Sequence, residues 1–237
     1  MKTLITGALL ISATLGIATV KAQTVDEIVN KHITALGGKD AINSVKTVYV
    51  ESSVDLMGNE APSTTYILNG KAYKSELTFN GAKIIQCVTD HGGWGVNPLA
   101  GQTTPVDMPA EQVKSAQLNL GLGGPLMDYA SKGSKVSLEG KDTADYKLKL
   151  VTKDGPEILY YINTKTYLID KAINKSSMGG QDMETTAMFS DYRKTDAGIM
   201  MPYSQQVVLP QITLNITNKK VEVNKEIDPA IFEKPKS

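Results

Sequence analysis

The stretch from Ser63 to Thr89 reads STTYILNGKAYKSELTFNGAKIIQCVT, and it contains three strand-like segments separated by two Asn-Gly pairs. Asn69-Gly70 and Asn80-Gly81 are typical of two-residue hairpin loops, which need positive φ at both loop positions. The segments between them are rich in β-branched and aromatic residues, which favour strands. This stretch therefore predicts antiparallel strands that follow one another through tight turns.

The same alternation of strands and turns continues from Val45 to Val223, with one helical interruption. A sheet of about a dozen antiparallel strands must curl or close to protect its edges. The pattern therefore predicts a mainly β protein with a single strongly curved antiparallel sheet that forms a half-open barrel, an N-terminal helix and a central helical lid. The expected strands are Val45–Leu56, Ser63–Leu68, Lys71–Thr78, Ala82–Thr89, Trp94–Asn97, Lys135–Glu139, Ala144–Thr152, Glu157–Asn163, Tyr167–Asn174, Glu184–Lys194, Tyr203–Leu209 and Ile212–Val223.

The segment before the first strand predicts a helix. Thr24 and Glu27 have the spacing of a capping box, and an apolar stripe follows them up to Leu36. Gly37-Gly38 is a typical helix end, and a second short helix is expected at Lys39–Ser44. We expect His32 to lie beside the polar face of the first helix, in contact with solvent.

The interruption of the sheet begins with a Pro-, Thr- and Gly-rich stretch, Leu99–Pro109, which predicts a loop. Asp107 is expected to cap a helix that runs to Leu118, and a second short helix is expected at Leu126–Ser131. Between them, the segment Leu118–Met127 combines large apolar side chains with three glycines. Two interpretations stay open: this segment is ordinary core at the end of the barrel, or it is a movable lid over a cavity.

Large apolar residues are the candidates for ligand contacts, because no polar motif competes with them. Leucines near the glycines could cover an apolar ligand, and flexible methionines suit a ligand of irregular shape. The candidate ligand-binding residues are Trp94, Leu118, Leu120, Leu122, Leu126, Met127, Met178 and Met183.

The first 22 residues have the three-part pattern of a secretory signal peptide. Lys2 is followed by an apolar stretch from Leu4 to Val20, and Ala22 ends a permissive cleavage site. We therefore expect cleavage near Ala22, export to the periplasm and a single domain over 23–237. The residue directly after the cleavage site is Gln23 and not a cysteine, so we expect no lipid anchor. No later apolar segment is long enough to span a membrane, and a monomer is expected.

The charge balance and the single cysteine argue against several kinds of function. Cleavage removes two lysines and no acidic residue, which leaves 23 basic against 25 acidic residues. This balance argues against a nucleic-acid partner, which needs a clustered basic face. The single cysteine, Cys87, lies in an apolar strand and is expected to be buried and inert. We expect no metal, no cofactor and no catalytic residues, so the chain is not interpreted as an enzyme; a hydrolase built on His91 and Asp90 is the weakest alternative.

Several short motifs, taken in order, resemble the outer-membrane lipoprotein-sorting protein family. The matching pieces are Thr24–Val48, Gly93–Pro98, Asp107–Glu111, Tyr161–Ile169 and Phe189–Arg193 with Gly198 and Pro202. The resemblance implies a LolA-like half-open barrel with a helical lid, related to the periplasmic carrier that moves lipoproteins to the outer membrane.

The resemblance and the apolar candidates lead to one functional expectation. We expect a periplasmic carrier or binding protein for a lipid, an acyl chain or a lipoprotein, with possible envelope proteins as partners. Burial of a CH₂ group yields about 0.8 kcal/mol, so a chain of roughly 15 carbons offers about 12 kcal/mol before association costs. An apolar groove alone is enough for such a ligand. The alternative is an envelope protein–protein interaction module whose barrel is filled by its own side chains.

Overall fold

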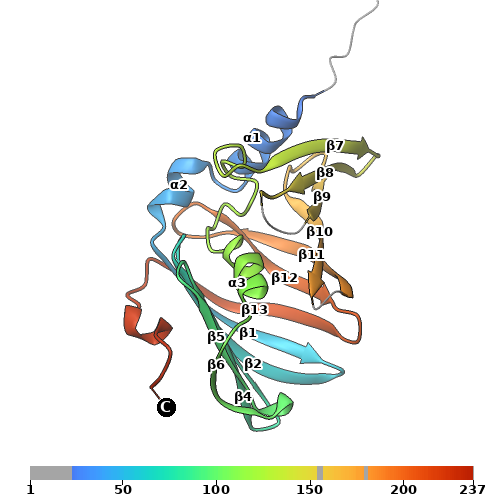
Figure 1. The fold of residues 1–237 in the computed structure, drawn as a ribbon. Helices are drawn as coiled ribbons and strands as arrows, with labels where there is room; N and C mark the ends of the chain where they lie inside the picture. The colour runs from blue at the N-terminus through green and yellow to red at the C-terminus, as the bar shows by residue number, and fades with distance from the viewer. Residues whose placement is uncertain (1–22, 154–156, 179–180, 237) are drawn as a thin grey trace, which may run out of the picture.

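The computed structural model describes residues 23–153, 157–178 and 181–236, without the side chains of 176–178 and 181–183. The predicted signal peptide, residues 1–22, lies outside this part of the chain. The described strands form one 13-stranded antiparallel sheet in the order β6-β5-β4-β3-β2-β1-β13-β12-β11-β10-β9-β8-β7. The sheet curls around its own inner face, and α3 lies across that face (Figure 1). This confirms the predicted mainly β fold.

The helices and strands follow the chain in a simple order. The helical elements are α1 (Val25–Ala35), α2 (Lys39–Ser44), η1 (Pro98–Ala100), α3 (Ala110–Gln117) and η2 (Pro229–Phe232). The strands are β1 (Thr47–Leu56), β2 (Asn59–Leu68), β3 (Ala72–Phe79), β4 (Ala82–Thr89), β5 (Gly93–Asn97), β6 (Gln102–Asp107), β7 (Lys135–Lys141), β8 (Asp145–Val151), β9 (Glu157–Asn163), β10 (Ile169–Met178), β11 (Gln181–Lys194), β12 (Met200–Val208) and β13 (Thr213–Val223).

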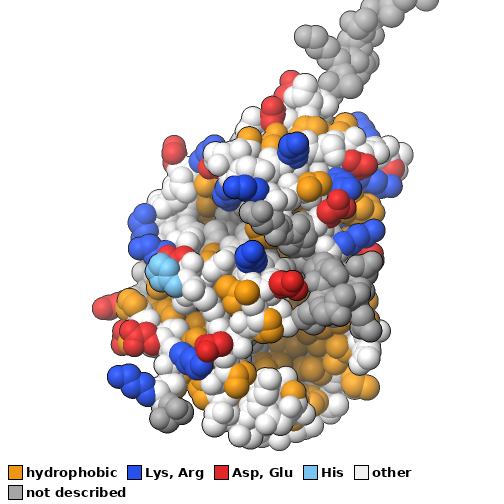
Figure 2. Space-filling model, in the orientation of Figure 1, with side chains coloured by type: hydrophobic (Ala, Val, Ile, Leu, Met, Phe, Trp, Pro, Cys, Tyr) orange, Lys and Arg blue, Asp and Glu red, His pale blue; other side chains and the backbone are white. Residues whose placement is uncertain are grey.

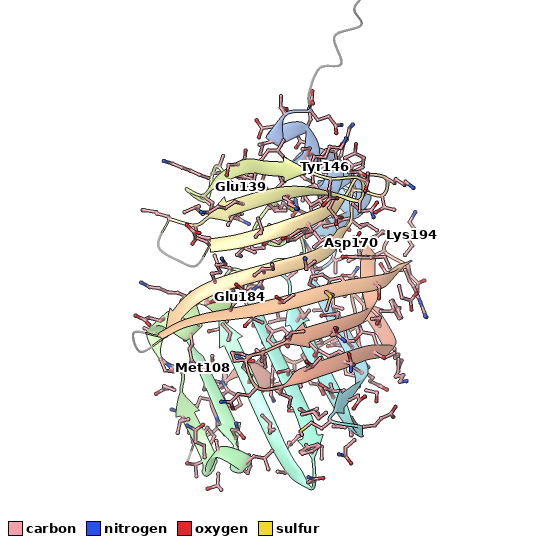
Figure 3. The ribbon with its side chains drawn as sticks, turned by 90° about the vertical axis from the view of Figure 1, so that its right-hand side faces the viewer. Met108, Glu139, Tyr146, Asp170, Glu184 and Lys194 are labelled. Atoms are coloured by element: carbon pink, nitrogen blue, oxygen red, sulfur yellow. The ribbon has the colours of Figure 1, made fainter. Side chains whose placement is uncertain are left out.

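The order of the strands explains why the barrel is half open. Each strand pairs with its neighbours in sequence, except that β1 pairs with β13 and the chain leaves the sheet between β6 and β7. β6 and β7 are therefore the two edges of the sheet. The insert that joins them crosses the inner face from one edge to the other. Figure 3 shows the other half of the sheet, with Glu184 and Lys194 near the two ends of the long strand β11.

The N-terminal helix confirms one prediction and corrects another. Thr24 and Glu27 form the predicted capping box, and Gly37 follows the end of α1 with φ of +120°. The prediction that His32 is solvated was wrong, because its side chain is only 2% exposed. His32 lies three residues after Val29 and four after Ile28, so it shares the buried stripe of the helix.

The segment from Leu99 to Ser131 differs from the prediction in three places. The stretch predicted as a loop contains η1 and β6, because Gln102–Asp107 pairs with β5. The cap of α3 is Pro109 rather than Asp107, and no side-chain oxygen accepts a hydrogen bond there. The expected helix Leu126–Ser131 consists of turns. Edge pairing and packing decide these segments more than local propensity does.

The two Asn-Gly turns also differ from each other. Asn80 and Gly81 have φ of +50° and +77°, as the hairpin prediction requires. In the other turn Gly70 has φ of +76°, but Asn69 is not among the described residues with positive φ. The loop between β2 and β3 is one residue longer than expected. Its Asn69 side chain is instead used for contacts described below.

Two buried clusters lie on opposite faces of the sheet. The main core packs α1, α2 and Leu126 against the face of β1 that carries Val48 and Val50; we call this the inner face. The smaller cluster packs Phe232 of η2 against Cys87 and Trp94 on the outer face. Burial raises the pKa of the Cys87 thiol to about 11, which agrees with the predicted inert, buried cysteine.

Candidate functional site

A cavity of about 510 Å³ lies between the inner face of β9–β12, the helices α1 and α2, and the insert. This volume falls in the range of small-molecule sites. The lining residues are His32, Leu36, Ile42, Asn119, Gly121, Leu122, Gly123, Gly124, Pro125, Leu126, Ile158, Tyr160, Ile169, Ala172, Asn174, Thr185, Ala187, Phe189, Tyr192, Ile199, Met200, Met201, Pro202 and Gln205. None of these carries a carboxylate, an ammonium or a guanidinium group.

Two small side chains explain why the sheet is hollow here. Residues directly opposite each other in neighbouring strands share a face, and Ala172 of β10 lies opposite Ala187 of β11. On its other side Ala172 lies opposite Tyr160 of β9. The adjoining strands β8 and β9 fill the same face with leucine, isoleucine and tyrosine, which belong to the main core. The pair of alanines leaves space that these larger residues occupy elsewhere.

The segment Leu118–Met127, which we call the strap, is the part of the insert that covers one side of the cavity. The strap is held by backbone and side-chain hydrogen bonds to the β2–β3 loop. The Gly70 N–H donates to Leu120 O at 2.9 Å, and the Leu122 N–H donates to Asn69 Oδ1 at 3.0 Å. Asn69 Nδ2 in turn donates to Ile42 O and Val45 O. One carboxamide therefore joins the strap to the C-terminal end of α2.

The glycines of the strap serve its packing. Gly124 has φ of +64°, a conformation that other residues adopt at a cost. A Cβ atom on Gly123 would lie 2.2 Å from Met127 Sδ. Leu120 and Leu126 are 5% and 1% exposed. These contacts favour the interpretation of the strap as packed structure, in which the glycines permit a turn and a close approach.

The predicted ligand-binding residues are distributed over several surfaces. Leu122 and Leu126 line the cavity. Leu118 and Leu120 line a neighbouring depression of about 570 Å³, which shares Gly121 and Pro125 with the cavity. Met127 lines a smaller depression of about 260 Å³, which shares Leu122 and the strap glycines with the cavity.

Trp94, Met178 and Met183 are placed differently. Trp94 lies on the outer face, where its Nε1 donates to Phe232 O at 2.9 Å, so it does not line the cavity. Met178 and Met183 lie in β10 and β11, but their side chains are outside the described part of the structure. The ligand contact proposed for these two methionines therefore stays a prediction.

Further polar residues of the cavity wall are neutral. His32 Nδ1 lies 2.8 Å from Tyr167 O, and because a carbonyl only accepts, Nδ1 carries the hydrogen. Burial lowers the pKa of His32, with the Tyr167 carbonyl acting in the opposite direction, so the ring is neutral. Burial also raises the pKa values of Tyr160 and Tyr192, which keeps both hydroxyls protonated. The Tyr192 hydroxyl donates to Ile169 O.

The hydrolase alternative rests on an exposed pair. His91 Nε2 lies 3.5 Å from Asp90 Oδ1, and the His91 side chain is 91% exposed at the turn before β5. This is the geometry expected for a polar residue in a hairpin turn. No group of three or more His, Cys, Asp or Glu side chains within the described ranges is placed to hold a metal ion. In the same ranges no helix has the length and apolarity needed to cross a membrane.

Sequence reasoning missed Asn69, Tyr160 and Asn174. Asn69 was interpreted only as a turn residue, because its partners lie far away along the chain. Tyr160 and Asn174 stand in strands at inner-face positions, and the alternation of each strand could have placed them there. Nothing local shows that their neighbours are small enough to leave a cavity.

Figure 2 shows a second feature of the inner face. A hollow lined by hydrophobic side chains opens where β1, β2 and β13 lie in Figure 1. By register, Val54 of β1 and Ile216 of β13 face this side of the sheet. The inner face therefore offers apolar surface beyond the cavity.

Comparisons with known proteins identify the fold. No family model matches the chain, and no curated protein matches it in sequence. A LolA superfamily protein from Nitrosomonas europaea is 13% identical with a TM-score of 0.60, covering 90% of this chain and 99% of its own. A putative outer membrane lipoprotein-sorting protein domain from Vibrio parahaemolyticus is 10% identical, with a TM-score of 0.56 and coverage of 87% and 96%. A DUF1329 family protein from Desulfovibrio piger is 16% identical, with a TM-score of 0.57 and coverage of 88% and 97%. The chain therefore has a LolA-like fold.

Proposed function

We propose that this protein is an exported carrier or binding protein for a lipid, an acyl chain or the acyl chains of a lipoprotein. The observation that carries this proposal is the cavity between the strap and the inner face, because it is largely apolar and its described lining holds no charged side chain. An alkyl chain can be buried in such a space without desolvating an ion.

Two further observations support the proposal. The solved structures of similar fold include proteins named for lipoprotein sorting. The first 22 residues have the pattern of a signal peptide, which fits a role in the cell envelope. The alternative of a protein–protein interaction module with a filled barrel is less well supported, because it requires side chains to occupy the space that the cavity leaves open.

The test compares filling the cavity with the introduction of the same residue on the opposite face. Ala187→Phe places a ring in the cavity, whereas Met188→Phe changes the next residue of β11, which faces outward and is 36% exposed. Binding of the uncharged methyl ester of dansyl-labelled undecanoic acid is measured by fluorescence titration for both variants and the unmodified protein. We expect at least a tenfold loss of affinity for Ala187→Phe and no change for Met188→Phe.

Thermal unfolding of both variants checks that the sheet is intact. If Ala187→Phe does not fold, Ala172→Leu fills the same space from β10 with a smaller side chain. Two results would overturn the proposal: no binding of the probe by the unmodified protein, or equal binding by folded variants with a filled cavity. Mass spectrometry of protein extracted without detergent adds an independent readout, since a carrier should retain a lipid.

A further inference from the structure

The cavity wall contains polar groups that bind nothing within the described chain. Asn174 lines the cavity, and its Oδ1 is buried without a hydrogen-bond partner among the described residues. A buried amide oxygen without a partner costs free energy, and native structures rarely tolerate one. Asn174 therefore indicates that a bound molecule or water completes the site.

The position of Asn174 makes it part of a small polar area. Thr185 of β11 lies directly opposite Asn174, and Ile158 of β9 lies opposite it on the other side. Tyr160 stands two residues further along β9, so it is a diagonal neighbour of Asn174 on the same face. Its hydroxyl also lacks a partner within the described part of the chain. Three adjacent strands thus present hydroxyl and carboxamide groups at one wall of an otherwise apolar cavity.

The polar groups of this wall favour some head groups of an acyl ligand over others. A carboxylate or phosphate needs a cation when it leaves water, and the described lining provides none. An ester has a carbonyl that can accept from Asn174 Nδ2 but has no hydrogen to donate to Oδ1. A secondary amide has both a carbonyl and an N–H. Its N–H can therefore donate to the unpartnered Asn174 Oδ1, which an ester cannot do.

We propose that the cavity binds an acyl chain that is joined to its head group through an amide, and that Asn174 recognises this amide. The inference rests on the proposed function, because it assumes that the alkyl chain occupies the cavity. The wall around Asn174 then discriminates between acyl derivatives that have the same chain and differ only in their polar group.

The experiment uses three ligands with the same alkyl chain: N-methyldodecanamide, methyl dodecanoate and dodecanoate. Each displaces a fluorescent acyl probe from the full mature protein, and the inhibition constants are compared. We expect the amide to bind about tenfold more tightly than the ester, which corresponds to one additional neutral hydrogen bond in a buried site. We expect the carboxylate to bind most weakly.

Two variants assign the effect to the carboxamide. Asn174→Leu has a similar volume and should bind the amide and the ester with equal affinity. Lys175→Ala changes the next residue of the same strand, which is exposed, and should keep the tenfold preference. Equal binding of amide and ester by the unmodified protein would overturn the inference and leave the proposed function standing. Binding of none of the three ligands would overturn both. A preference that persists in Asn174→Leu would show that another group reads the amide.

Discussion

Asn69→Ala should destabilise the protein by about 3 kcal/mol, because three hydrogen bonds converge on this side chain. Asn69 Nδ2 donates to Ile42 O at 2.9 Å and to Val45 O at 2.8 Å, and Oδ1 accepts from Leu122 N at 3.0 Å. Each such bond contributes about 0.5–1.5 kcal/mol net. For a chain of this size the loss corresponds to a decrease in Tm of roughly 6–12 °C. Urea unfolding followed by circular dichroism measures the change directly.

A second substitution separates the contributions of the two amide atoms. Asn69→Asp keeps an oxygen that can accept from the Leu122 N–H, but it removes both donated bonds and places a carboxylate oxygen against two carbonyl oxygens. It should therefore be at least as destabilising as Asn69→Ala at neutral pH. Hydrogen exchange distinguishes the variants, because the Leu122 amide should lose protection in Asn69→Ala and keep more of it in Asn69→Asp.

The control is Asn43→Ala, which changes an exposed asparagine of α2. It should alter the free energy of unfolding by less than about 0.5 kcal/mol, as surface substitutions usually do. If Asn69→Ala is no more destabilising than Asn43→Ala, the argument that this side chain fixes the strap is wrong.

Three further predictions follow from the described contacts. Because burial lowers the folded-state pKa of His32, the unfolded chain binds a proton first, and the free energy of unfolding should fall as the pH decreases below about 6.5, by at most about 1.4 kcal/mol per pH unit from this site. His32→Gln should remove this pH dependence in urea titrations at several pH values. If the exposed His91→Gln removed it instead, the assignment to His32 would be wrong. Gly124→Ala should lower the free energy of unfolding by about 1–2 kcal/mol, because Gly124 has a positive φ. Gly121→Ala, with open space around its Cβ position, should have a smaller effect. Equal melting curves for the two variants would contradict the argument that φ at Gly124 requires glycine. Trp94→Phe should lower the free energy of unfolding by about 1 kcal/mol, because the hydrogen bond to η2 is lost, and it should leave the affinity for the acyl probe unchanged. A large loss of affinity would show that the outer face takes part in binding.

Most of the fold could be predicted from the sequence, because caps, turns and strand alternation depend on residues that lie close together in the chain. The capping box at Thr24 and the φ values of Asn80-Gly81 depend on immediate neighbours, so the sequence alone predicts them. Alternating apolar residues predicted the strands, and a sheet of this size has to curl. The exceptions are informative: the strand β6 forms because β5 offers it an edge, although its own residues favour a loop.

The candidate site depends on long-range packing, which no local pattern contains. Trp94 was expected to contact a ligand, but η2 covers it on the outer face, and the strand period alone does not say which face a distant segment will cover. His32 was expected to be solvated, but Tyr167 and the sheet enclose it.

The sequence by itself therefore determined most of the strands, most of the turns and the curved sheet, since these follow from side-chain period and turn chemistry. Only the tertiary structure decided where the sheet is hollow. The cavity exists because Ala172 and Ala187 meet across two strands, and because Asn69 holds the strap above them. Register and side-chain volume in three dimensions set both conditions, and neither is visible in a linear pattern.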